Sequence, residues 1–588
     1  MKDLDLDLTL RDAALEAALD AVRQRAVDES WADRAIGRRD PSVWSGEDKV
    51  QRAIATRLGW LEAPFHFADE TTELAAFAMG IGDDGFTTAV LGGMGGSSLA
   101  PALLVHTFGT KDGIPVRVLD STDPAAVAAT LDDLDPIQTL FIVSTKSGTT
   151  AESLSFQAYE WERTEKRLDE AEDRGGHKAG DYMVAITDPE KSLHSIPHHD
   201  MLREFFLNTP DVGGRYSALT FVGLVPGALL GLDLEDLLKR ARDMVIACGE
   251  PDLTQNPGVS LGLAMGAFAK AGRDKLTFVI DRELSAFGPW VEQLIAESTG
   301  KETLASLARR AHDPQAPVER TGIVPVDAEP LGQVGAYGND RVFVRIALKG
   351  SAGPEPVVGS NVDARLTELA NAGHPVIRIE IGDKIEIGAE FVRWEVATAI
   401  AGVVLGIEPF DQPNVEEAKA NTREVLAAFE KGGAPEGDQP LEVSDASFGG
   451  ALKAALAKLP AGGYASLQAY IAQTPERDAA LTRLRVMLRD KTLRATTSGY
   501  GPRFLHSTGQ LHKGGKANGW FLQLVAEHPD DREIPGKSYT FGNLIDAQAI
   551  GDALTLGQHD LPVLRVCLGK DPDAGLAALQ KALATALG

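Results

Sequence analysis

The sequence predicts an α/β protein built on two successive parallel sheets, with a helical arm before them and a further α/β segment after them. Short apolar runs alternate with helical patterns from Thr88 onward, which is typical of parallel sheets covered by helices on both faces. The chain has 588 residues, enough for about three or four domains of ~150 residues. No run of ~18 or more apolar residues occurs, so the sequence predicts no membrane-spanning helix.

The N-terminal segment, residues 10–80, is predicted to be helical. Leu15, Leu19 and Val22 recur there at helical spacing. The three tryptophans of this segment are expected to be packing anchors: Trp31, Trp44 and Trp60.

Two series of apolar runs predict the strands of the two sheets. The first series lies at residues 89–91, 116–119, 140–143 and 184–186. The second series lies at residues 276–280, 323–326, 342–347 and 376–381.

A Gly- and Pro-rich stretch at 431–440 is predicted to be a linker, and the α/β segment after it ends in a predicted helix at 574–587. These features divide the chain into four expected units. They are a helical N-terminal arm, a first and a second sheet domain, and a C-terminal α/β module, with the boundaries 1–80, 81–245, 246–430 and 431–588.

Charge and cysteine content restrict the function and the compartment. Lys and Arg number 58 and Asp and Glu 85, a formal net charge of −27, which argues against a surface that binds nucleic acid or anionic lipid but leaves room for a local basic pocket. Cys248 and Cys567 are too few and too far apart in the sequence for a disulfide framework or a cysteine metal site. The acidic, amphipathic start of the chain does not have the pattern of a signal peptide. A cytoplasmic location is therefore expected.

A glycine-rich turn follows the first apolar run, in TTAVLGGMGGSSLAPAL at residues 88–104. Such a turn, leading into a helix, lets backbone N–H groups approach an anion. A dinucleotide site is the alternative interpretation. Gly93 and Gly95 fit its G-x-G-x-x-G/A pattern, Ser98 breaks it, and Asp120 would suit a ribose hydroxyl.

A second polar loop, in TLFIVSTKSGTTAES, follows a neighbouring strand. Thr149 and Glu152 could form a helix capping box without any ligand, but the loop holds more hydroxyl and ammonium groups than capping needs. Because ligands of open α/β sheets bind at the carboxyl ends of the strands, we infer that the two loops bind one phosphate monoester.

Three shorter segments carry further candidate residues. Arg215 follows two glycines in NTPDVGGRYSALTF, and Glu297 ends an apolar helical stretch in AESTGKE. The latter is no Walker motif, because Ile295 stands where that motif needs glycine. In IEPFDQPNVEEAK, Gln412 and Lys419 flank a helix start.

Two histidine-bearing segments differ in their surroundings. In SGYGPRFLHSTGQLHKGG, at residues 498–515, His506 and His512 lie among glycines and basic residues, as in a functional loop. The second segment has no carboxylate in the H-E-x-x-H arrangement and is interpreted as surface loop rather than as a metal site. Its histidines are His194, His198 and His199.

Taken together, these segments resemble the phosphoglucose isomerase family, also called glucose-6-phosphate isomerase, whose members have two sugar-isomerase (SIS) domains. GGMGGSSLAP, STKSGTTAES, VGGRYSA, ESTGK and FDQPNVEEAK occur in the family's order. Arg215 falls in the family's G-G-R-[FY]-S signature, and Lys419 closes its F-D-Q-x-[GN]-V-E-x-x-K signature. The likeness runs from about Trp31 to near the C-terminus. It is greatest to the isomerase half of bifunctional transaldolase/phosphoglucose isomerase fusions, and the His506 segment is typical of that subgroup.

The resemblance implies two SIS-type parallel-sheet α/β sandwich domains and the reversible isomerisation of glucose 6-phosphate and fructose 6-phosphate, a step of glycolysis and gluconeogenesis. It implies Glu297 as the base that moves a proton through a cis-enediol, Arg215 as the cation for the enediolate, and His506 with Lys419 for ring opening. It implies no cofactor and no metal. The implied substrate-binding residues are Gly95, Gly96, Ser97, Thr145, Lys146, Ser147, Thr149, Thr150 and Gln412.

The order of one segment departs from the family. Its histidine segment, L-H-S-x-G-Q in many bacterial members, comes before the FDQ-like segment, whereas His506 follows it here, with His512 as the alternative. The C-terminal module must therefore bring the histidine to the site, from the same subunit or from a partner. The sequence shows no barrel-length segment before the isomerase part, so no transaldolase activity is expected.

The expected partner is a small sugar phosphate, with no nucleic acid and no membrane, and a homodimer is one expected assembly because the family is commonly dimeric. Two alternatives stay open. One is an isomerase of mannose 6-phosphate or of an amino sugar, which shares the chemistry. The other is a non-catalytic sugar-phosphate sensor, which would have no reason to keep Glu297, Arg215 and Lys419 in their motifs.

Overall fold

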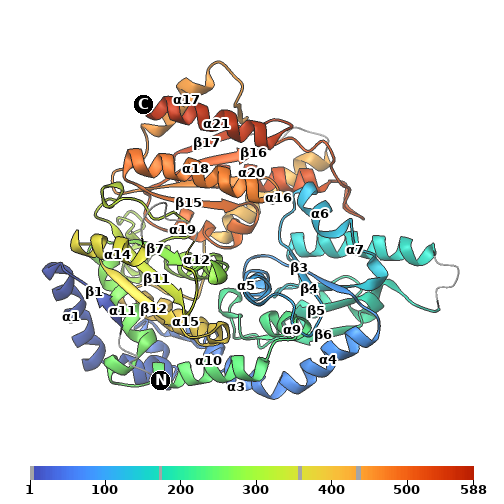
Figure 1. Cartoon of the computed structure of the whole chain (residues 1–588), viewed down its shortest axis with the longest axis horizontal. Helices are drawn as coiled ribbons and strands as arrows, with labels where there is room; N and C mark the ends of the chain where they lie inside the picture. Colours follow the sequence, from blue (N-terminus) through green and yellow to red (C-terminus); the bar gives the residue numbers. More distant parts are fainter. Residues whose placement is uncertain (1–5, 171–174, 355–360, 432–438) are drawn as a thin grey trace.

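The computed structural model describes residues 6–170, 175–354, 361–431 and 439–588. These residues form three five-stranded sheets and one two-stranded sheet. The third large sheet, in orange and red, lies above the other two in Figure 1. The predicted α/β class with parallel sheets is confirmed, while the domain boundaries stay a prediction.

The first sheet is parallel throughout, in the order β3-β2-β4-β5-β6. Its strands are β2 (Thr88–Gly92), β3 (Val116–Leu119), β4 (Thr139–Ser144), β5 (Met183–Thr187) and β6 (Glu204–Leu207). The sequence analysis did not predict β6, in which only Phe206 of the four side chains is buried. The helices of this region are α5 (Leu99–Phe108), α6 (Pro124–Leu131), α7 (Ala151–Asp169), α8 (Lys191–His194) and α9 (Phe221–Leu229).

The second sheet has the order β1-β12-β11-β7-β10, and β1 is its antiparallel strand. Its strands are β1 (Asp7–Thr9), β7 (Lys275–Ile280), β10 (Val324–Val326), β11 (Arg341–Leu348) and β12 (Val376–Ile381). The N-terminal segment thus adds an edge strand that the sequence did not predict. The helices around this sheet are α10 (Leu234–Cys248), α11 (Pro257–Lys270), α12 (Phe287–Thr299), α13 (Leu304–His312), α14 (Val362–Asn371) and α15 (Ile387–Leu405), and β8 (Lys301–Glu302) pairs with β9 (Arg320–Thr321).

The N-terminal helices pack against both of these sheet regions. They are α1 (Ala13–Asp28), α2 (Asp48–Ala55), α3 (Ala63–His66) and α4 (Thr71–Asp83). All three tryptophans of the segment are buried, which confirms them as packing anchors. Trp44 donates from Nε1 to the carbonyl of Ala399 at 2.8 Å, and Trp60 stacks on Tyr216 with ring centroids 5.2 Å apart.

The third sheet is parallel, in the order β13-β17-β16-β14-β15. Its strands are β13 (Leu441–Glu442), β14 (Tyr464–Tyr470), β15 (Ala495–Tyr500), β16 (Gly519–Val525) and β17 (Val563–Cys567). Its helices are α17 (Phe448–Leu456), α18 (Pro475–Thr492), α19 (Gly509–Gly514), α20 (Phe541–Gln558) and α21 (Pro572–Leu587), and α16 (Val415–Glu430) packs on α20. Most of the predicted linker, at 432–438, lies outside the described residues.

Buried ion pairs join the region of the third sheet to the second sheet. Arg489 and Arg485 of α18 lie beside Glu329, which pairs with Arg341 of the second sheet at 3.1 Å. Breaking such a pair by removing one partner costs about 3–5 kcal/mol, because the remaining charge stays buried. These contacts fix the C-terminal module against the rest of the chain. Within the described ranges, no helix has the length and apolarity needed to cross a bilayer.

Candidate active site

The glycine-rich turn after β2 is a point of close backbone approach. Gly95 has φ +54°, and a Cβ there would lie 2.6 Å from the carbonyl oxygen of His506. A Cβ at Gly96 would lie 2.2 Å from the carbonyl oxygen of Gly214. Only glycine fits at these two positions. The turn therefore brings the Arg215 segment and the His506 segment to the carboxyl end of the first sheet.

The second polar loop lies after β4 and leads into α7. Thr145 donates to the hydroxyl of Thr150 at 3.1 Å, and the hydroxyls of Ser147 and Thr149 lie 2.9 Å apart. The N-cap residue Thr150 makes no side-chain capping bond, so the first N–H groups of α7 remain available to an anion.

Lys146 does not point at these hydroxyls. Its Nζ donates to Asp188 at 2.5 Å and to the carbonyl of Pro210 at 3.2 Å. Lys146 still lines a small cleft together with Ser97 and Gly214, so it lies at the rim of the same site.

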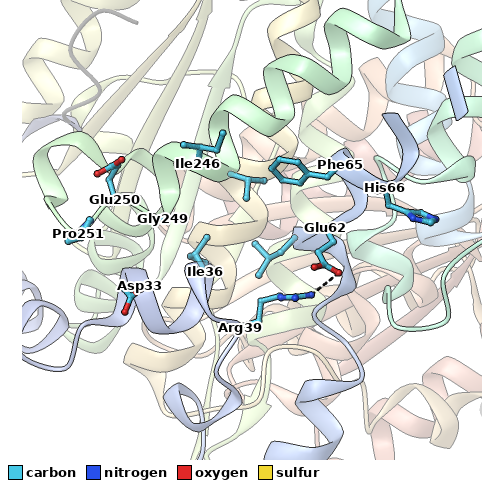
Figure 2. Close-up of a pocket in the computed structure, with 13 residues that line it drawn as sticks. Asp33, Ile36, Arg39, Glu62, Phe65, His66, Ile246, Gly249, Glu250 and Pro251 are labelled. Atoms are coloured by element: carbon cyan, nitrogen blue, oxygen red, sulfur yellow. Dashed lines mark ion pairs between the residues drawn. The ribbon is translucent and has the colours of Figure 1, made fainter. Parts of the chain in front are cut away.

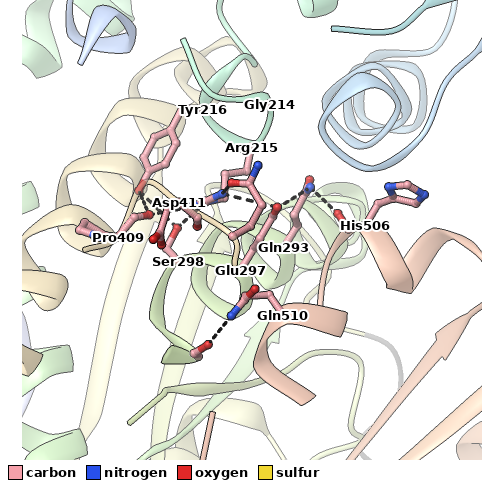
Figure 3. Close-up of polar contacts among 12 residues, drawn as sticks. Gly214, Arg215, Tyr216, Gln293, Glu297, Ser298, Pro409, Asp411, His506 and Gln510 are labelled. Carbon is pink, nitrogen blue, oxygen red and sulfur yellow. Dashed lines mark hydrogen bonds and ion pairs between the residues drawn. The ribbon is translucent and has the colours of Figure 1, made fainter. Parts of the chain in front are cut away.

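Arg215 is buried and its guanidinium donates four hydrogen bonds (Figure 3). Nε donates to Ser298 Oγ at 2.8 Å and Nη1 donates to Gln412 Oε1 at 3.1 Å. Nη2 donates to the carbonyls of Pro409 and Asp411 at 2.6 and 2.9 Å. The Arg215 guanidinium thus links the ESTGK segment to the FDQ segment.

Glu297 lies in the last turn of α12, with its side chain 11% exposed. Its Oε1 lies 3.5 Å from Nη1 of Arg215, and its Oε2 accepts a hydrogen bond from Gln293 Nε2 at 3.1 Å. The same Nε2 donates to the carbonyl of His506 at 2.7 Å (Figure 3). Glu297 is therefore held between a cation and an amide, with the His506 loop alongside.

His506 is aligned by Glu152, the residue that could have belonged to a capping box. His506 Nε2 lies 2.9 Å from Glu152 Oε1, which also accepts from Gln548 Nε2 at 2.7 Å. Burial acts to raise the pKa of Glu152, but the charges of His506 and Lys419 and the His506 hydrogen bond outweigh burial, so the pKa lies below its ordinary value. Glu152 is therefore a carboxylate paired with the imidazole, not a cap.

The structure distinguishes the two histidines of that segment. His512 is 3% exposed and packs against Tyr464 and Phe521. Burial, aided by the charge of Lys513, holds the pKa of His512 well below its ordinary value. His506 is the histidine that reaches the site, and it comes from the same chain.

The L-H-S-x-G-Q segment also connects to the other motifs through Gln510. Its Nε2 donates to the carbonyl of Gly300 and to Asn414 Oδ1, both at 2.9 Å. Its Oε1 accepts from the backbone N–H of Asn414 at 2.9 Å. One glutamine thus links the histidine loop to the ESTGK and FDQ segments.

Two other sequence candidates are now placed. Lys419, on α16, is exposed, and its charge acts on Glu152. Asp120, the ribose-binding candidate, is paired instead with Arg503 through two contacts of 2.7 Å. Asp120 is therefore not available to bind a ribose hydroxyl, as the dinucleotide interpretation requires.

Sequence reasoning missed the roles of four residues around the site. Glu152 fits a helix cap, and Ser298 and Lys301 stand inside a motif without a role of their own. Gln293 lies four residues before Glu297, so helical spacing could have revealed it. Lys301 is 3% exposed and donates from Nζ to the carbonyl of Asp411 at 2.5 Å, which supports the loop that Arg215 contacts.

A separate hollow of about 840 Å³ lies beside α3 and α10 (Figure 2). Phe65 and Ile246 line it, and an ion pair of 2.8 Å joins Arg39 to Glu62. None of the candidate site residues lines this hollow.

Comparisons with known proteins agree with the motifs. The family model described as phosphoglucose isomerase matches residues 77–317. A glucose-6-phosphate isomerase of Rubrobacter xylanophilus is 32% identical over 367 residues, which are 58% of this chain and 82% of the relative. This chain belongs to the phosphoglucose isomerase family. Another member, from Carboxydothermus hydrogenoformans, is 28% identical over 63% of this chain and 85% of its own length.

Solved structures show the same fold. A hypothetical protein of Thermus thermophilus aligns with a TM-score of 0.56 and 25% identity, over 72% of this chain and all of that protein. A glucose-6-phosphate isomerase of Chlamydia trachomatis aligns with a TM-score of 0.51 and 17% identity, over 76% of this chain and 89% of its own. The match to the phosphoglucose isomerase model ends before the FDQ and His506 segments.

Proposed function

We propose that this chain catalyses the reversible isomerisation of glucose 6-phosphate and fructose 6-phosphate. One observation carries the proposal. A single carboxylate, Glu297, lies 3.5 Å from the Arg215 guanidinium and is linked through Gln293 to the loop of His506, beside the phosphate-type loops of the first sheet.

The chemistry moves one proton between carbon 1 and carbon 2 through a cis-enediol. Glu297 takes the proton from one carbon and returns it to the other, which contributes roughly 10²- to 10⁴-fold in rate. Transfer between adjacent carbons needs a base that reaches both, and one carboxylate held from two sides meets this requirement. Oε2 of the carboxylate accepts from Gln293, so we assign the proton transfer to Oε1, which lies beside Arg215.

Arg215 stabilises the oxygen that becomes negative in the enediolate. Its four hydrogen bonds hold the guanidinium in place before the reaction, so little reorganisation is needed as the charge develops. Losing one such stabilising contact costs about 10²–10³ in kcat.

His506 opens the sugar ring by giving a proton to the ring oxygen. Glu152, whose pKa lies below its ordinary value, places a carboxylate 2.9 Å from Nε2 of His506 and orients the imidazole for this step. Lys419 lies near this pair and assists at the same oxygen.

The phosphate of the substrate lies between the two polar loops. Gly95, Gly96 and Ser97 offer the glycine-rich turn, and the hydroxyl loop with the N-terminus of α7 faces the same space. Thr145, Ser147, Thr149 and Thr150 supply the hydroxyls of that loop, Lys146 supplies a cation at the rim, and Gln412 contacts the sugar.

We further propose that each chain holds a complete site, since His506 reaches Glu152 of the same chain.

The proposal is tested by assaying fructose 6-phosphate formation from glucose 6-phosphate with the wild type and with Glu297→Gln. We expect turnover to fall by about 10²-fold or more in the variant while binding of the sugar phosphate, measured by calorimetry, persists. Mannose 6-phosphate in the same assay tests the alternative substrate. Near-normal turnover in the variant, or faster turnover of mannose 6-phosphate, would contradict the proposal.

A further inference from the structure

A second cavity, of about 680 Å³, lies where the three large sheets meet. The strands that reach it are β3, β10 and β15, each of which is an edge strand of its sheet. Asp120 follows the carboxyl end of β3, Asp327 follows that of β10, and Tyr500 ends β15, and all three line the cavity. Ligands of α/β proteins bind at such strand ends and at domain interfaces, in cavities of about 300–1,000 Å³.

The cavity is distinct from the candidate active site. None of the proposed catalytic or substrate-binding residues lines it. The two are neighbours, because the short helix Arg503–His506 contributes Arg503 to the cavity and His506 to the site.

The cations of the cavity wall already have partners. Arg503 donates to Asp120 through Nε and Nη2 and to Gln473 through Nη1. Arg485 donates through Nη1 and Nη2 to Ser498 and to the carbonyls of Asp327 and Thr496. An anionic ligand would have to displace these bonds.

Two carboxyls of the cavity wall, unlike these arginines, have no side-chain hydrogen-bond partner among the described residues. Glu292 of α12 and Asp327 accept no side-chain hydrogen bond within the part of the chain that the structure describes. Burial, together with the nearby charge of Asp327, raises the pKa of Glu292 to about 8. Burial raises the pKa of Asp327 to about 6. The charge of Arg485 acts on both carboxyls and the backbone N–H of Ala328 donates to Asp327, but neither carboxyl has an ion pair inside the described ranges of the chain.

The wall also offers hydroxyls and one unused donor. Ser285 and Thr482 also line the cavity. Arg485 is 2% exposed, and its Nε has no acceptor among the described residues. A ligand that fits this wall carries both a positive charge and hydroxyl oxygens.

We propose that this cavity binds a small hydroxylated primary amine, of the size of an amino sugar or an amino polyol, whose ammonium group lies between Glu292 and Asp327. The ammonium supplies the donors that the two carboxyls lack, and its hydroxyls face the serine, threonine and arginine groups of the wall. A metal ion fits less well, because no group of three or more His, Cys, Asp or Glu side chains suited to a metal occurs in the described residues. Binding at this cavity does not depend on the proposed isomerase function.

The test is titration calorimetry of the whole chain above about pH 8, where both carboxyls are ionised. The probes are glucamine and sorbitol, two six-carbon polyols that differ only in an ammonium group against a hydroxyl group. We expect glucamine to bind once per chain, and sorbitol to bind about tenfold more weakly or worse. No heat from glucamine, or equal affinity for the two probes, would overturn the proposal.

The location is tested with Glu292→Gln, and with Asp327→Asn if the first variant unfolds more readily than the wild type. Either change should weaken glucamine about tenfold or more, since it removes one charged acceptor. Glu62→Gln, which removes a carboxylate from the other hollow, is the matched control and should leave the affinity unchanged. Unchanged binding in both cavity variants, or displacement of glucamine by glucose 6-phosphate, would place the amine elsewhere and refute the site.

Discussion

The pairing of Glu152 with His506 makes a sharp prediction for the Glu152→Gln variant. The amide keeps an oxygen where Glu152 Oε1 accepts from His506 and from Gln548, at 2.9 and 2.7 Å, but it removes the negative charge. The side chain keeps its size, so the local packing of α7 is preserved. The variant therefore isolates the effect of the carboxylate charge on the histidine.

The size of the effect follows from the kind of bond. A hydrogen bond to a charged group contributes about 1.5–3 kcal/mol, and about 1.4 kcal/mol corresponds to tenfold in rate or affinity. We expect kcat for glucose 6-phosphate to fall by about 10- to 150-fold, which corresponds to loss of the whole contribution of this bond at the ring-opening step. The loss should be much smaller with a shorter aldose phosphate that cannot close a ring, because no ring then has to be opened.

The matched control is Glu160→Gln on the same helix. Glu160 is also buried, but it pairs with Arg163 and lies two turns along α7 from Glu152. Steady-state kinetics of both variants with both substrates are the measurement. If Glu152→Gln kept wild-type kcat, or lost as much with the open-chain substrate, the role of Glu152 in aligning a ring-opening acid would be refuted.

Three further predictions concern the turn, the guanidinium and a buried carboxyl. Gly96→Ala should lower the free energy of unfolding in urea by about 1–3 kcal/mol and reduce turnover, because its Cβ would overlap the Gly214 carbonyl. The control is Gly46→Ala, which has open space around it and should change the free energy of unfolding by less than about 0.5 kcal/mol. Arg215→Lys should lower kcat about 10²-fold without a matching rise in KM, since one ammonium cannot span the four acceptors, and unchanged kcat would contradict the enediolate role. Burial raises the pKa of Glu160 to about 7, above the unfolded value, so the folded state holds this proton longer and stability should fall by roughly 3 kcal/mol from about pH 4.5 to about pH 7. In the Glu160→Gln variant, this pH-dependent loss of stability should be absent. If the free energy of unfolding of the variant depended on pH as that of the wild type does, the raised pKa of Glu160 would be refuted.

Within the first two sheets, the sequence predicted every interior strand and two of the four edge strands, β3 and β10. All eight apolar runs of the two series correspond to strands, because buried parallel strands need continuous apolar residues. The edge strands β1 and β6 were missed: β1 has one apolar residue among its three, and β6 exposes three of its four side chains. Whether such a segment forms a strand depends on the neighbouring strand it pairs with, which the local sequence pattern does not reveal.

The candidate site was predicted as a set of motifs but not as a network. Spacing within a motif placed Arg215 and Glu297, whereas Glu152 meets His506 from 354 positions away in the sequence. A buried carboxylate and its partner are recognised only when the fold brings them together. The same holds for Gln510, whose amide joins three segments.

The central claim is that Glu297 moves a proton between carbon 1 and carbon 2 of the sugar phosphate. Conversion of glucose 6-phosphate in deuterated water, followed by NMR, tests this claim most directly. The wild type should place solvent deuterium at carbon 1 of part of the fructose 6-phosphate formed, because a carboxyl proton exchanges with water, and Glu297→Gln should neither exchange nor isomerise at a comparable rate. Deuterium incorporation by the variant at the wild-type rate, or isomerisation by the wild type with no solvent deuterium in the product, would contradict the account.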